Sequence, residues 1–183
     1  MILLVDLCYE KESLSMYEFV HPIADILMHS GFSIEIRHYS ELARHMPEKY
    51  DKIILCGTAL KDNYYAKQIS SFSWIKCCRT PLLGICAGMQ VIGSVFGGRI
   101  VPQQAIGLET IEIIRESALL GEPRTIEGYH LHNFGVTVPD DFLLLAGYDE
   151  HVEAFKHKNL SIYGIIFHPE VRNRWILDRF ANL

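Results

Sequence analysis

A strand that turns abruptly into a helix is encoded at residues 81–90, and this turn constrains the fold more than any other stretch. The apolar run Leu82–Ile85 is typical of a buried strand, and apolar residues at helical spacing follow it. Gly84 and Gly88 flank Cys86 in the pattern Gly-x-Cys-x-Gly, where small residues permit a sharp bend. Cys86 is therefore predicted to be an exposed nucleophile at a helix N-terminus, which favours a thiolate. A small buried cysteine beside a helix-packing glycine is the alternative.

Length and composition limit the class of protein. The 183 residues predict one domain spanning 1–183. A net charge of -5 without long runs gives no indication of a nucleic acid or membrane partner. Five cysteines, odd in number and without metal-ligand spacing, favour a reducing cytoplasm over a disulfide scaffold. The apolar run Ile2–Val5 is too short for a signal peptide or a membrane span.

Strand-like runs alternate with helical patterns in the first half of the chain. This alternation predicts a parallel sheet with helices on both faces. The strands expected before Leu82 are Ile2–Val5, Phe32–Arg37 and Lys52–Cys56, and the helices are Ser13–Met28 and about Asn63–Ser71.

Short strand-like runs separated by turn signals fill the second half and predict an antiparallel extension. The expected strands are Thr110–Arg115, Thr125–Leu131, Phe134–Val138, Phe142–Ala146, Val152–Lys156 and Ile162–Phe167. A last helix is expected from about Asn173 to Ala181.

A candidate partner for Cys86 follows another strand. The apolar run Ser161–Phe167 ends in His168-Pro169-Glu170, and the proline holds His168 extended, so that His168 and Glu170 can project to one side. A carboxylate beside an imidazole orients it and favours its protonated form. Because open α/β sheets place their sites at the carboxyl ends of strands, these side chains are predicted to meet Cys86.

The segments Gly84–Gln90 and Tyr163–Val171 resemble the class I glutamine amidotransferase family. The similarity covers most of the chain. The resemblance implies an α/β fold with a flavodoxin-like core, in which a doubly wound, mostly parallel sheet flanked by helices carries a short antiparallel extension. Within the family, Val152–Lys158 looks most like the amidotransferase subunit of GMP synthetases, whereas Tyr129-His130 is similar to the chorismate-using members.

The resemblance also implies roles for individual residues. Cys86 would attack the side-chain amide of glutamine, His168 would move protons, and Glu170 would orient His168. The other implied residues surround the oxyanion and the substrate: Gly57, Thr58 and Ala87 for the oxyanion, and Gln90, His132 and Asn133 for glutamine.

One loop departs from the family pattern. Family members usually carry Gly-Gly-Pro where this chain has Gly57-Thr58-Ala59. If the second position needs a left-handed backbone, Thr58 would resist it, and the oxyanion hole would be incomplete or form only with a partner.

The resulting hypothesis is a glutaminase subunit that passes ammonia to a separate ATP-dependent synthase, with xanthosine monophosphate as the first candidate acceptor and chorismate as the second. A partner-independent γ-glutamyl or peptide hydrolase and a non-catalytic binding protein remain as alternatives. No cofactor is expected. His130 and His132 could ligate a metal, but no third ligand completes such a site, so none is expected. The remaining histidines of the first half, His21, His29, His38 and His45, are expected to be solvated.

Overall fold

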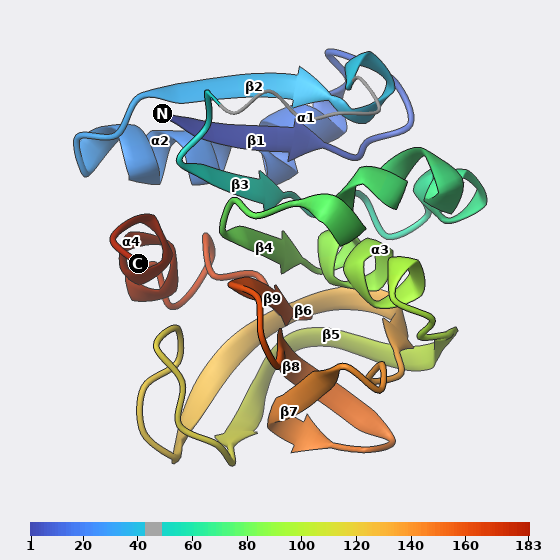
Figure 1. Ribbon diagram of the computed structural model, residues 1–183, viewed down its shortest axis with the longest axis vertical. Coiled ribbons are helices and arrows are strands. Elements are labelled where there is room, and N and C mark those ends of the chain that lie inside the picture. Colours follow the sequence, from blue (N-terminus) through green and yellow to red (C-terminus); the bar gives the residue numbers. More distant parts are fainter. Residues whose placement is uncertain (43–48) are drawn as a thin grey trace.

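Nine strands within the described residues form one sheet in the order β2-β1-β3-β4-β9-β8-β7-β5-β6 (Figure 1). The computed structural model describes residues 1–42 and 49–183, so the expectation for His45 lies outside the described residues. The parallel strands are β2 (Ile34–His38), β1 (Ile2–Asp6), β3 (Lys52–Leu55), β4 (Leu82–Ile85) and β9 (Ile162–Ile165). The antiparallel strands are β8 (His151–His157), β7 (Phe142–Tyr148), β5 (Ile100–Ile113) and β6 (Arg124–Val136).

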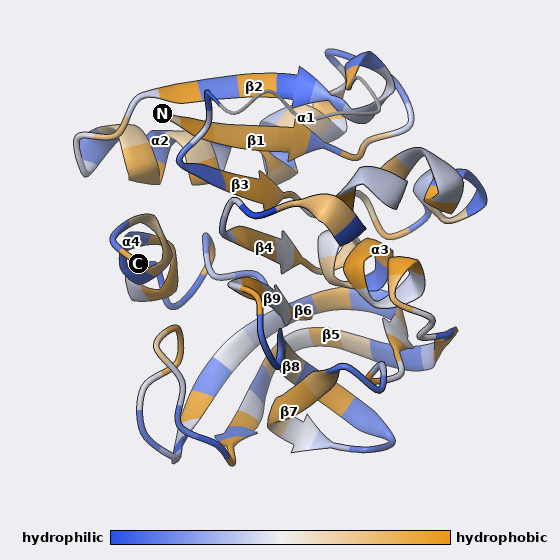
Figure 2. Ribbon diagram, viewed as in Figure 1, coloured by the Kyte–Doolittle hydropathy of each residue, from blue (hydrophilic) through white to orange (hydrophobic). Residues whose placement is uncertain are grey.

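Helices cover both faces of the parallel strands, as predicted. The helices are α1 (Leu14–Phe19), α2 (His21–His29), α3 (Ala87–Val95) and α4 (Trp175–Ala181), with 3-10 segments η1 (Tyr39–Glu41) and η2 (Tyr64–Cys77). Side chains of β1 alternate between two cores: Ile2 and Leu4 pack with α2 and α4, and Leu3 and Val5 pack with η2 and α3. This alternation gives β1 its continuous apolar sequence, which Figure 2 shows in orange.

The antiparallel part is larger than the short extension that the sequence predicts. β5 and β6 contain 14 and 13 residues and pair along nearly their whole length. The sequence predicts only Thr110–Arg115 as a strand in this region. Pro102 and Gly107 lie in the part that it does not predict. In the structure, a bulge shifts the register between Pro102 and Ala105. The two runs predicted within residues 125–138 are one strand, β6.

The helix expected over Ser13–Met28 is wrong as a single element. It divides at Val20 into α1 and α2, and Pro22 lies in the first turn of α2. Proline has no N–H to donate and its ring clashes with the preceding turn, so it begins a new helix. The helix expected over about Asn63–Ser71 is instead the longer 3-10 segment η2, which is kinked at Gln68.

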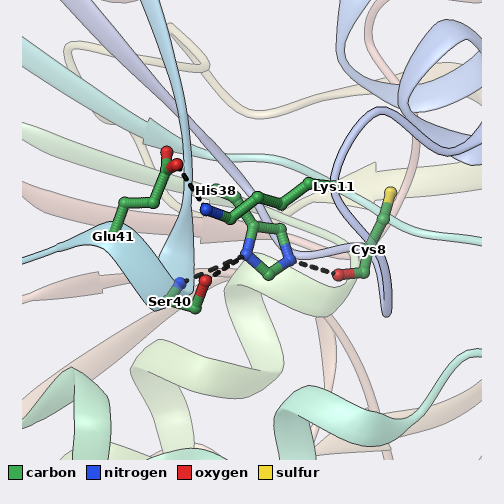
Figure 3. A network of polar contacts seen from close by, with 5 residues as sticks. All are labelled: Cys8, Lys11, His38, Ser40 and Glu41. Carbon is green, nitrogen blue, oxygen red and sulfur yellow. Dashed lines mark hydrogen bonds and ion pairs between the residues drawn. The ribbon is translucent and has the colours of Figure 1, made fainter.

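The expectation that His38 is solvated is also wrong. Its side chain is buried, and Figure 3 shows it between two loops. The Nε2–H donates to the Cys8 carbonyl oxygen at 2.8 Å, and Nδ1 accepts from the Ser40 hydroxyl at 2.7 Å. Lys11 and Glu41 form an ion pair beside it at 2.5 Å. His38 therefore fastens the loop after β1 to η1.

Replacement of His38 with alanine is expected to lower the free energy of unfolding by about 1–3 kcal/mol, because the buried Cys8 carbonyl loses its donor. Urea denaturation measures this change. The matched control is His29→Ala, which removes an exposed imidazole and should change stability by less than about 0.5 kcal/mol. Equal losses in the two variants would contradict a fastening role for His38.

No described helix is long and apolar enough to cross a membrane.

Candidate active site

Three neighbouring parallel strands bring the predicted residues together. β3, β4 and β9 lie side by side, and each continues at its carboxyl end into part of the site. Gly57 and Thr58 follow β3, Cys86 follows β4, and His168 follows β9. β6 joins them from the antiparallel part, where the His168 N–H donates to the Tyr129 carbonyl at 2.8 Å.

Cys86 occupies the sharp turn that its flanking glycines predict. Its backbone angles are φ 50° and ψ -104°, a strained conformation for a residue with a side chain. A Cβ on Gly88 would lie 2.2 Å from the Leu55 carbonyl oxygen, and one on Gly84 would lie 2.5 Å from the Gly88 backbone. The two glycines thus let α3 pack directly on β3 and β4, which fixes the turn.

The thiol of Cys86 is covered, which corrects the expectation that the turn exposes it. The residue is 4% exposed, and its Sγ lies 3.9 Å from the Leu131 carbonyl oxygen. The cavity beside it has a volume of about 10 Å³ and is lined by residues of four segments, including Thr58, Ala87, His132 and Asn133. A volume of that size holds about one water molecule, so a ligand as large as an amino acid requires the site to open.

His168 and Glu170 form a buried pair beside Cys86. The Nδ1–H of His168 donates to Glu170 Oε1 at 2.8 Å, and both side chains are 2% exposed. Burial by itself lowers the pKa of His168, but the Glu170 carboxylate and the Cys86 sulfur outweigh burial and raise that pKa to about 10. His168 Nε2 has no hydrogen-bond partner within the described residues. The imidazole is therefore a cation at neutral pH, with a free N–H.

The loop after β3 lines the cavity without a strained backbone. Neither Gly57 nor Thr58 has a positive φ, so the left-handed backbone that Thr58 would resist is not required. Thr58 and Ala87 line the cavity with Cys86. No backbone carbonyl of the described residues accepts from either N–H.

Gln90 is buried, and both ends of its amide are engaged. Oε1 accepts from the Tyr65 hydroxyl at 2.6 Å, and Nε2 donates to the Phe134 carbonyl at 2.7 Å. Gln90 is 2% exposed and ties α3 to β6 and η2. Tyr65 is a site neighbour that sequence reasoning missed, because it lies 25 residues from Gln90 without a motif.

His132 and Asn133 lie on the β6 wall of the cavity. The His132 Nδ1–H donates to the Gln103 carbonyl at 2.7 Å. Burial lowers the pKa of His132 to about 4, so this imidazole is neutral. The Asn133 amide donates to the Leu60 carbonyl at 3.4 Å, joining β6 to the loop after β3. His130 is paired with Glu153 at 2.7 Å, away from Gln103.

A second, larger cavity adjoins the one at Cys86. Its volume is about 560 Å³, and it shares Ala59, Asp62 and Asn63 with the smaller cavity. Tyr9 and Tyr64 also line it. The three shared residues form the wall between the larger cavity and the nucleophile.

A cysteine on a strand-to-helix turn, facing a buried His–Glu pair at the carboxyl ends of parallel strands, defines a class of α/β proteins built for a cysteine nucleophile. The family model described as "Glutamine amidotransferase class-I" matches residues 14–175. The chain belongs to this family, as the resemblance in its sequence implies.

Relatives within the family agree with this assignment. The glutamine-hydrolysing GMP synthase subunit of Pyrococcus furiosus is 44% identical over 112 residues, which cover 56% of this chain and 60% of that protein. The protein of the same name from Methanococcoides burtonii is 36% identical over 132 residues, covering 69% and 67%. For several other relatives of that name, the matched region spans 53% to 60% of their length.

Solved structures show the same fold. A crystal structure of a protein described as a GMP synthase subunit, from Thermoplasma acidophilum, superimposes with a TM-score of 0.82 at 27% identity, covering 99% of this chain and 92% of that one. A glutamine amidotransferase from Thermotoga maritima gives a TM-score of 0.70 at 20% identity, covering 100% and 83%, and supports the fold alone.

Proposed function

We propose that the protein is a glutamine-hydrolysing subunit in which Cys86, His168 and Glu170 act as a catalytic triad. The Cys86 thiolate attacks the side-chain amide carbon of glutamine, and the carbonyl oxygen becomes an oxyanion. His168 Nε2–H protonates the departing nitrogen, so that ammonia leaves and a glutamyl thioester remains on Cys86. Water, deprotonated by His168, then cleaves the thioester to glutamate and regenerates the thiolate.

The observation that carries this proposal is the buried, hydrogen-bonded His168–Glu170 pair beside the nucleophile. A histidine with a pKa of about 10, hydrogen-bonded through Nδ1 to Glu170, stabilises a thiolate and has a proton for the leaving group. A binding protein has no need of this charge arrangement. The N–H groups of Thr58 and Ala87 are the proposed oxyanion donors, and Gln90, His132 and Asn133 the proposed glutamine contacts. Gln90 would reach glutamine only when its bonds to Tyr65 and Phe134 open together with the cavity.

The proposed partner is an ATP-dependent synthase subunit, of the GMP synthase type. The names of the relatives support this assignment, because several are the glutamine-hydrolysing subunit of GMP synthase. The small volume of the cavity at Cys86 supports dependence on a partner, since contact with a second protein chain would supply the energy that opens it.

Glutamate release from glutamine by the purified protein, alone and with an ATP-dependent GMP synthase subunit, tests the proposal. We expect activity to rise at least about tenfold when the synthase is added. Full activity without a partner would favour the γ-glutamyl hydrolase alternative. Absence of Cys86-dependent turnover in both conditions would contradict the proposed function.

The contact between Gly57 and His168 makes a separate prediction. A Cβ at Gly57 would lie 2.8 Å from His168 Cε1, so Gly57→Ala should push the imidazole away from Cys86. We expect kcat to fall by about 10²-fold, because a displacement of about 1 Å at the reacting groups has that effect. Steady-state glutaminase kinetics measure the loss, and Cys77→Ser, at an exposed residue that does not line the cavity, serves as the control. An unchanged kcat in Gly57→Ala would mean that His168 does not act from its observed position.

A further inference from the structure

The carboxylate of Asp62 gathers donors from three separate segments around the loop after β3. Its Oδ2 accepts from the Thr58 hydroxyl at 2.8 Å and from the Tyr9 N–H at 2.5 Å. Its Oδ1 accepts from the Tyr64 N–H at 3.3 Å. The Asp62 N–H in turn donates to the Ala59 carbonyl at 2.8 Å. Asp62 thus connects the loop after β1, the loop after β3 and the start of η2.

Two members of this cluster, Asp62 and Thr58, line the cavity at the nucleophile, and Thr58 is the one whose N–H is a proposed oxyanion donor. It is 4% exposed and lines the small cavity with Cys86 and Ala87. Threonine is branched at Cβ and has few accessible χ1 rotamers. Holding its hydroxyl on Asp62 therefore holds its backbone and the direction of its N–H as well.

From this geometry we infer that Asp62 is a positioning residue for the oxyanion site, acting through the side chain of Thr58. The inference rests on the proposed function. An oxyanion donor is effective only when it is held within a few tenths of an ångström of its productive position before the reaction. A loop with Gly57-Thr58-Ala59 and no proline needs another source of rigidity. The charge-assisted bonds to Asp62 supply it, and a hydroxyl group on residue 58 is required to form one of them.

Thr58→Val and Asp62→Ala test the inference, and Thr58→Ser should restore function because it keeps the hydroxyl. All variants are made in a Cys77→Ser background, since Cys77 is an exposed thiol that would also react with the probes. Two reactions at Cys86 are compared, both in the complex with the synthase subunit, because that partner is proposed to open the cavity at Cys86. With p-nitrophenyl acetate, the thiolate attacks the ester carbonyl, an oxyanion forms, and p-nitrophenolate leaves an acetyl thioester. With iodoacetamide, the thiolate displaces iodide directly and no oxyanion forms.

We expect Thr58→Val and Asp62→Ala to slow Cys86 acylation by about 10-fold to 10²-fold, below the full effect of removing an oxyanion donor, and to leave alkylation by iodoacetamide unchanged. Glutamine hydrolysis should lose kcat by a similar factor, with little change in KM. Acylation should return to within about threefold of the parent in Thr58→Ser.

Three results would overturn the inference: parent-like acylation in Thr58→Val, equal losses of acylation and alkylation, or no Cys86-dependent acylation in the parent protein. The first would mean that the hydroxyl positions nothing, and the second that the variants disturb the whole site. The proposed function fails separately, if the parent protein acylates with the ester but hydrolyses no glutamine with or without the synthase.

Discussion

Replacement of Cys86 with alanine is expected to lower glutamine hydrolysis by at least about 10³-fold, because the bond-forming sulfur is lost while the backbone donors remain. Cys86 lies at the start of α3 with its Sγ in a small cavity, so removing the sulfur leaves the glycine packing around it intact. Glutamate release by the complex with a synthase subunit measures the effect. Synthase activity driven by added ammonia should persist, because ammonia bypasses the thioester.

Cys77→Ser is the matched control, since it removes an exposed thiol far from the cavity and should leave hydrolysis unchanged. The two alternatives give different outcomes with Cys86→Ala. A partner-independent hydrolase would lose turnover that the wild-type protein shows alone. A binding protein would keep its function in the variant, and that result would exclude a nucleophilic role for Cys86.

The triad could be predicted from the sequence because each of its members lies in a local motif. Cys86 is fixed by the glycines on either side of it, and His168 and Glu170 are fixed by the proline between them and the strand before. In the structure, β4 and β9 are adjacent and parallel, and this brings the two motifs together at the carboxyl ends of the strands, where the sequence predicts the site. The structure corrects the exposure of the thiol, because β6 covers it from a distant part of the chain.

The contacts that support the site could not be predicted in the same way. Tyr65 and Asp62 act through partners that become close only when η2 and the loop after β1 fold onto the sheet. The sequence predicts that His38 is solvated, yet its imidazole is buried and donates to the Cys8 carbonyl. Tertiary contacts of this kind have no periodic signal in the sequence.

At the break between α1 and α2, two local signals in the sequence conflict: a proline that interrupts a helix, and apolar residues at a spacing that continues it. Pro22 ends the first helix, but the apolar residues of α1 and α2, such as Phe19 and Ile23, keep a helical spacing across it. The length of β5 likewise depends on its pairing with β6. This pairing extends the strand through Pro102 and Gly107, two residue types that disfavour strands.

Replacement of Glu170 with glutamine is expected to move the alkaline limit of activity to lower pH. Glutamine keeps the shape of the side chain and an oxygen that accepts from His168 Nδ1–H, but it removes the negative charge. Burial disfavours the protonated imidazole, and in the variant no carboxylate charge at position 170 offsets that effect. The pKa of His168 should therefore fall from about 10 by about one to three units. The protonated imidazole is the form that donates a proton to the departing amide nitrogen, so kcat should decline above the lowered pKa.

The sign of this shift separates an electrostatic role for Glu170 from a purely structural one. The pKa of His168 in the folded protein lies above the ordinary value of about 6.5, so protonation of His168 favours the folded state. This contribution to stability is complete below about pH 6.5 and is lost as pH rises through about 10. In Glu170→Gln the loss should begin at lower pH, together with the loss of kcat. Structural damage alone would lower kcat equally at every pH.

An NMR titration of the His168 imidazole and the pH profile of glutamine hydrolysis, both from about pH 6 to about pH 10, measure the shift without reference to absolute activity. Glu127→Gln is the control, because it neutralises a largely exposed carboxylate paired with Arg172 and should move neither curve. If the alkaline limb stays in place in Glu170→Gln, the charge of Glu170 does not hold the proton on His168. The Cys86 thiolate would then be the group responsible, and Cys86→Ala should lower the pKa of His168 instead.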